Sequence, residues 1–106
     1  MQSKKYSVIL SRRADNMLVE HTEFLARVSP EAARRLLDGF SKIMLVLSNT
    51  PQQYPYADSV DAPGIPPATY RKCLFGNRYK ALFLMDDDIV YIDAIIDCRQ
   101  ENKMLF

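Results

Sequence analysis

Residues 69–98 read TYRKCLFGNRYKALFLMDDDIVYIDAIIDC and contain three segments that are rich in aromatic and β-branched side chains. The segments are Thr69–Phe75, Arg78–Met85 and Ile89–Cys98, separated by a Gly-Asn pair and by three aspartates. This pattern predicts three strands in a meander with tight turns. Because side chains alternate along a strand, we expect one face of the last strand to pack on the rest of the protein. That face would hold Val90, Ile92, Ala94 and Ile96, and the other, half-polar face Ile89, Tyr91, Asp93, Ile95 and Asp97.

A short strand and two helices are predicted upstream. The apolar run Tyr6–Leu10 is typical of a strand, and Ser11 after it can cap a helix. From residue 14 to 28, apolar residues recur at three- and four-residue spacing, with His21 among them, which predicts a helix with a buried, hydrogen-bonded histidine. Ser29-Pro30 then fits the cap and first position of a second helix, which Pro51 stops.

Five of the six prolines fall between residues 51 and 67. Such a stretch cannot be helix or central strand, so we expect a long irregular surface connection that is a candidate for function. The predicted order is β-α-α-β-β-β in one α+β domain spanning residues 1–106. A helical hairpin would pack on one face of a small, mainly antiparallel sheet and leave the other face open.

Composition limits the functions that fit this chain. The net charge is only +1, so a site for a polyanion must be local. Residues 71–80 hold four cations, whereas residues 86–101 hold six carboxylates and one arginine. No apolar run reaches the roughly 18 residues of a membrane span and the start is unlike a signal peptide, so we expect a cytoplasmic protein. Cys73 and Cys98 lack metal-type spacing and are expected to be reduced, and neither metal nor cofactor is implied.

The chain resembles the RelE/ParE toxin superfamily of type II toxin–antitoxin systems along nearly its whole length. The resemblance is carried by Tyr70-Arg71-Lys72, Gly76-Asn77-Arg78-Tyr79, Val90-Tyr91-Ile92 and the final Arg99. The spacing of Ser11, Ala14 and Leu18 and the segment Pro51–Pro55 resemble the ParE branch, also called plasmid stabilisation proteins.

The resemblance implies a growth-inhibiting toxin that a cognate antitoxin binds and silences. ParE-like members inhibit DNA gyrase, RelE-like members cleave ribosome-bound mRNA, and some members have lost toxicity. All three functions stay open at this point: gyrase inhibitor, metal-independent endoribonuclease, or an antitoxin-binding partner without toxicity.

Metal-free RNA cleavage needs a base, a proton donor and cations around the phosphate. By the resemblance, Arg71, Lys80 and Arg99 are the candidate catalytic or phosphate-binding residues, converging on the open face. Two mismatches count against a nuclease: Cys73 replaces a second basic residue, and the segment after Lys103 has no tyrosine. The gyrase inhibitor is therefore favoured.

Partner or target contacts are expected from four further residues: Lys72, Arg78, Tyr79 and Tyr91. A purely structural alternative is that Arg71, Lys80 and Arg99 pair across strands with Asp93 and Asp97.

Overall fold

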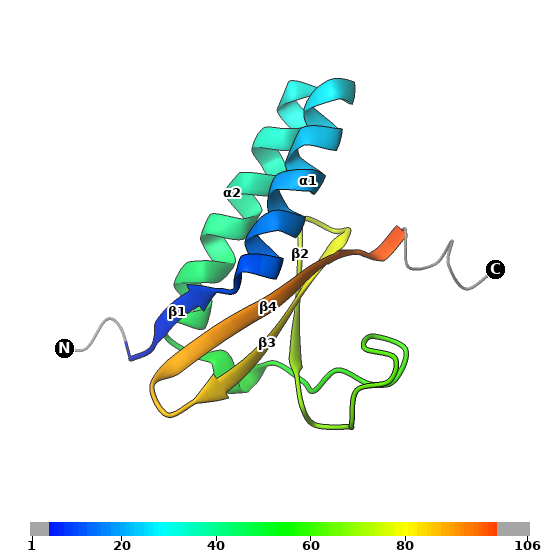
Figure 1. Cartoon of the computed structure of the whole chain (residues 1–106). Coiled ribbons are helices and arrows are strands. Elements are labelled where there is room, and N and C mark those ends of the chain that lie inside the picture. Colours follow the sequence, from blue (N-terminus) through cyan, green and yellow to red (C-terminus); the bar gives the residue numbers. More distant parts are fainter. Residues whose placement is uncertain (1–4, 100–106) are drawn as a thin grey trace.

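Four strands form one mixed sheet in the computed structural model, which describes residues 5–99 (Figure 1). The strands are β1 (Ser7–Leu10), β2 (Arg71–Phe75), β3 (Tyr79–Asp86) and β4 (Ile89–Asp97), in the spatial order β1-β4-β3-β2. The last three form the predicted antiparallel meander, and β1 lies parallel to β4. At the β2–β3 turn, Gly76 and Asn77 both have positive φ values near 62°, the conformation that Gly-Asn sequences favour.

The two helices are α1 (Arg12–Val28) and α2 (Pro30–Leu47), as predicted. Their caps follow from the sequence, because the hydroxyls of Ser11 and Ser29 accept the backbone N–H of Ala14 and Ala32 at 3.0 and 3.2 Å. Ser29 both ends α1 and caps α2, so the connection is a single residue. The helices therefore run as the antiparallel hairpin seen in Figure 1.

The main core lies between this hairpin and one face of the sheet. Its most deeply buried members from the sheet are Ala81, Phe83, Val90, Ile92 and Ile95. His21 on α1 belongs to the same region: its Nε2 donates to the carbonyl of Ile95 at 2.9 Å, and its ring lies 5.4 Å from that of Tyr79. The predicted hydrogen bond of His21 is present, but its ring is half-buried beside the core and not enclosed in it.

A β-bulge corrects the predicted faces of β4. Phe83 pairs with Ile92 but Leu82 pairs with Ala94, so Asp93 is an extra residue that β3 does not match. One inserted residue reverses the alternation downstream. Ile95 is therefore fully buried in the main core, whereas Ala94 joins the opposite face.

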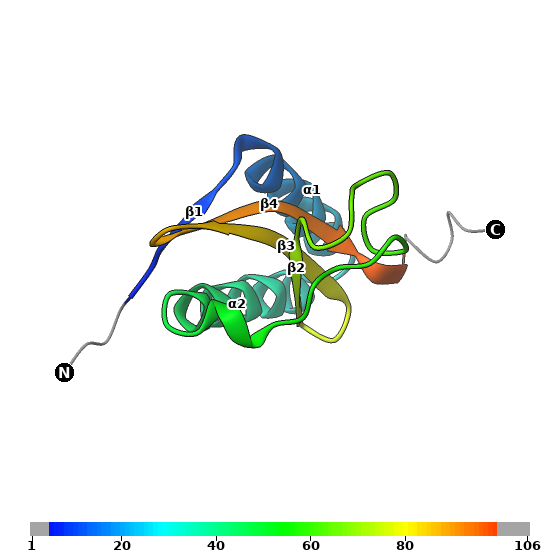
Figure 2. The ribbon, with the colours of Figure 1, turned by 90° about the horizontal axis from the view of Figure 1, so that it is seen from below.

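The sheet face opposite the helices was predicted to be open, but the proline-rich connection lies against it. After a 3-10 turn at Pro51–Gln53, residues 55–57 hydrogen-bond along the outer edge of β2. Ala57 and Ala62 then pack on Leu82 and Ala94, so the connection covers part of that face. Both views show the connection on the side of the sheet away from β1 (Figures 1 and 2).

Candidate functional site

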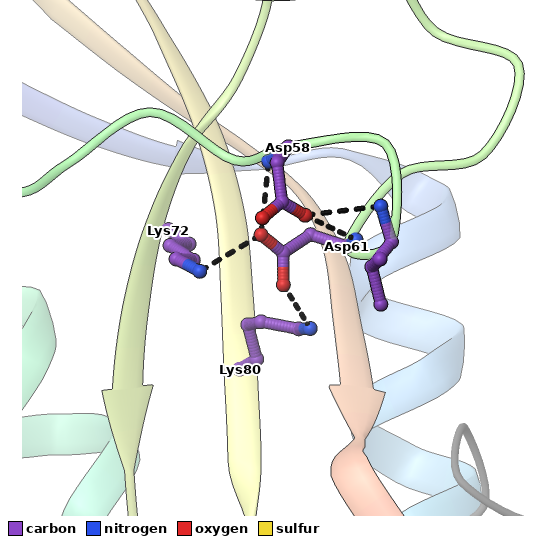
Figure 3. A network of polar contacts seen from close by, with 5 residues as sticks. Asp58, Asp61, Lys72 and Lys80 are labelled. Carbon is purple, nitrogen blue, oxygen red and sulfur yellow. Dashed lines mark hydrogen bonds and ion pairs between the residues drawn. The ribbon is translucent and has the colours of Figure 1, made fainter.

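A carboxylate from the proline-rich connection bridges two lysines of the sheet (Figure 3). Asp61 Oδ1 lies 2.6 Å from Lys80 Nζ, and Asp61 Oδ2 lies 2.9 Å from Lys72 Nζ. Lys72 and Lys80 come from β2 and β3 and project from the face opposite the helices. The side chains of Lys80 and Asp61 are only 4% and 8% exposed. Lys80, a predicted phosphate binder, is therefore engaged by a carboxylate of its own chain.

Local backbone structure places Asp61 in this position. Asp58 Oδ1 accepts the N–H groups of Val60 and Asp61, and the N–H of Asp58 donates to Asp61 Oδ2 at 2.9 Å. These bonds close a tight turn of the kind that aspartate favours. Burial by itself would raise the pKa of Asp61, but the hydrogen bonds from Lys80 and Lys72 outweigh it and hold the pKa far below its ordinary value.

A second ion pair joins Arg78 to Asp97. Two guanidinium nitrogens of Arg78 donate to the two carboxylate oxygens of Asp97, at 3.3 and 2.9 Å. Burial opposes ionisation of Asp97, but the hydrogen bonds from Arg78 and from the N–H of Arg99 lower its pKa overall. Asp97 lies on the helix side of the sheet, and its side chain is 5% exposed. The charge of Arg78 is thereby used to hold the end of β4.

Arg71 clamps the proline-rich connection to β2. Its guanidinium donates to the carbonyls of Gln52 and Tyr54 at 3.3 and 2.6 Å, donates to the hydroxyl of Tyr56, and lies 4.2 Å from the centre of the Tyr56 ring. Because side chains alternate along β2, Arg71 and Lys72 leave opposite faces. The expected convergence of Arg71 with Lys80 on one face is therefore not what the structure shows.

The remaining predicted residues separate into core and surface. Tyr79 is 3% exposed and packs on Phe75, with burial raising its pKa, so it lies in the core. Tyr91 is half-buried on β4, and Arg99 is exposed just after it. Among the candidate catalytic cations, Arg99 is the one at the surface.

The side chains that meet Asp93 and Asp97 are not the three cations named in the structural alternative. Asp97 pairs with Arg78, and Asp93 accepts the hydroxyl of Tyr70 at 2.5 Å and lies 3.8 Å from a guanidinium nitrogen of Arg13. Lys80 pairs with Asp61 rather than with either strand aspartate.

A separate groove of about 610 Å³ runs between α2 and the β2–β3 turn. Its floor is apolar, with Leu36, Ile43 and Phe75. Its rim is mainly basic, with Arg35, Lys42 and Arg78 beside Asp38. Arg35 and Lys42 were not predicted as site residues from the sequence, although their spacing on α2 places them one above the other on the same helical side.

Comparison of the sequence with models of protein families gives a match. Residues 8–102 match the family model described as "ParE toxin of type II toxin-antitoxin system, parDE". The chain belongs to this family. The resemblance to the RelE/ParE superfamily that the motifs carried, and the preference for its ParE branch, are both confirmed.

One similar solved structure is described as the chromosomal ParDE TA system from P. aeruginosa, with a TM-score of 0.66 and 16% identity. The match covers 88% of this chain and 96% of that one, and it supports the ParE-like fold. Comparison with curated protein sequences finds no match.

In residues 5–99, no group of three or more His, Cys, Asp or Glu side chains is placed to hold a metal ion. No helix in the same range is long and apolar enough to cross a membrane. Cys73 is buried, and desolvation raises the pKa of its thiol, which disfavours the thiolate needed for nucleophilic attack.

Asp61 is the site residue that sequence reasoning missed. The spacing of Asp58 and Asp61 within a proline-rich stretch is a signal for a local turn. Nothing in that local pattern shows that the Asp61 carboxylate contacts two lysines, 11 and 19 residues further along the chain.

Proposed function

We propose that this ParE-family toxin arrests growth by binding DNA gyrase, acts without cleaving mRNA, and is neutralised by a cognate antitoxin. The observation that carries the proposal is the state of the sheet cations. Lys72, Lys80 and Arg78 are held by carboxylates, and Arg71 is held by backbone carbonyls. A nuclease needs such cations to face the phosphate and stabilise its charge.

The acidic groups further weaken the case for RNA cleavage. Asp61 lies in the covered part of the sheet face, and Asp93 lies at the bulge on β4. Carboxylates at these places lower the positive potential that would attract an RNA backbone. The absence of a basic residue at Cys73 points the same way, because the thiol is buried in the core.

The groove beside α2 is the surface that we assign to the antitoxin. Its apolar floor and basic rim suit an amphipathic segment that carries acidic side chains, the arrangement of helix-in-groove recognition. A volume of about 610 Å³ leaves room for several anchor side chains. Co-expression of the toxin with its neighbouring gene and tag purification of one partner tests the pairing. Failure of the second protein to co-purify contradicts it.

Induced expression in cells tests the choice of target. Gyrase poisoning predicts that growth stops with a DNA-damage response before message levels fall. Codon-dependent cuts in translated messages, mapped by primer extension, with no damage response would favour the nuclease instead.

A further inference from the structure

The bridge between Asp61 and the two lysines has the geometry of an occupied anion site. Each carboxylate oxygen meets one ammonium group, at 2.6 Å from Lys80 and 2.9 Å from Lys72 (Figure 3). The lysines belong to the sheet, whereas the carboxylate comes from the proline-rich connection. A phosphate group presents oxygens that accept charge-assisted hydrogen bonds from ammonium groups in the same way.

We propose that Lys72 and Lys80 form an oxyanion site whose resident ligand is Asp61, and that Asp61 excludes RNA phosphate from this sheet face. Asp61 thereby acts as a specificity-determining residue. The inference rests on the proposed function in one respect, which is that the unmodified toxin does not bind RNA on this sheet face. Its test measures anion binding, whose result does not depend on the gyrase assay.

Charge supports this role. Of the three side chains Asp61, Lys72 and Lys80, the carboxylate is the one with negative charge, and its loss removes the charge that faces both ammonium groups. Lys72 is 29% exposed, so a ligand from solution can reach the site from that side. Removing Asp61 therefore uncovers a cationic site that is open at one edge.

The connection that supplies Asp61 is held on the sheet by few apolar contacts. Around Asp61, the buried apolar contacts with the sheet come from two alanines, Ala57 and Ala62. Val60 and Ile65, which flank them, are 56% and 39% exposed. Small side chains bury little surface. Arg71 and the backbone bonds of residues 55–57 hold the start of the connection, so loss of the Asp61 carboxylate loosens the turn at residues 58–61 and lets an external anion enter.

The test uses the full-length protein and two matched variants, Asp61→Asn and Asp58→Asn. Both remove one negative charge from the same turn, but Asp58 makes its contacts with backbone N–H groups and not with the lysines. Binding of a short fluorescein-labelled single-stranded RNA is followed by anisotropy. We expect Asp61→Asn to bind roughly tenfold more tightly than the unmodified protein or Asp58→Asn. Adding Lys72→Met to Asp61→Asn should remove the gain.

Inorganic phosphate provides a second readout that does not need RNA. At several times its dissociation constant, phosphate should raise the Tm of Asp61→Asn by about 4 to 8 °C beyond the rise in Asp58→Asn at equal ionic strength. If Asp61→Asn is unfolded in chloride, phosphate should restore its fold. Equal RNA affinity in the two Asn variants, or no phosphate-specific stabilisation or refolding, would overturn the proposal.

Discussion

Lys80 Nζ lies 2.6 Å from Asp61 Oδ1, and this contact ties the proline-rich connection to the middle of the sheet. Replacing Asp61 with Asn removes a negatively charged partner of a buried ammonium. We expect a loss of about 3 kcal/mol in the free energy of unfolding, because breaking a buried pair from one side leaves a charge poorly compensated. Urea denaturation measures the change. The Asp58→Asn variant, which alters only turn hydrogen bonds, should lose about 1 kcal/mol, and equal losses would contradict the account.

Acid should destabilise the protein through Asp61 and Asp97, whose pKa values are both lowered in the folded state. The ordinary value is 3.8, so the unfolded chain takes up protons there before the folded chain does. The stabilisation is complete above that pH and falls as the pH drops below it. Each group contributes a slope of up to about 1.4 kcal/mol per pH unit. Urea denaturation from pH 6 down to about pH 3 checks this, and an unchanged slope in Asp97→Asn would count against the prediction.

The bulge at Asp93 makes a prediction about neighbouring isoleucines. Ile95 is fully buried against the helices, whereas Ile96 is half-buried on the opposite face. Ile95→Ala should lower the free energy of unfolding by about 2 to 5 kcal/mol, and Ile96→Ala by less than half as much. Strict alternation along β4 would give the reverse order.

Most of the secondary structure could be predicted because its signals are local. Ser11, Ser29 and Pro30 fix the starts of both helices, and Gly76-Asn77 fixes the β2–β3 turn. The faces of β4 could not be predicted beyond the bulge. A single unmatched residue leaves no mark on a run in which nearly every position is apolar.

The site was predicted less well than the fold because it depends on contacts between distant segments. The basic residues were identified from their clustering, but Asp61 and the carbonyls of Gln52 and Tyr54 reach them through an irregular connection. No periodic pattern governs such a segment. The partners of Arg71 and Lys80 could therefore be learned only from the structure.

Alanine substitutions of Arg99 and Arg71 should have different effects on toxicity and on stability. Arg99 is exposed, so Arg99→Ala should change the free energy of unfolding by no more than about 0.5 kcal/mol while weakening growth arrest. Arg71→Ala should lower stability by more, since it removes the bonds to the connection. Growth arrest and thermal melting, measured side by side, decide this. Full toxicity of a folded Arg99→Ala protein would move the target surface to the basic rim of the groove at Arg35 and Lys42.

Gyrase supercoiling in vitro tests the proposed function most directly. The purified toxin is added to gyrase, ATP and relaxed plasmid, and a parallel reaction contains translating ribosomes with a defined message. The account predicts that supercoiling is lost as toxin is added while the message stays intact, and that purified antitoxin restores supercoiling. Unimpaired supercoiling together with cleavage of the message would contradict it.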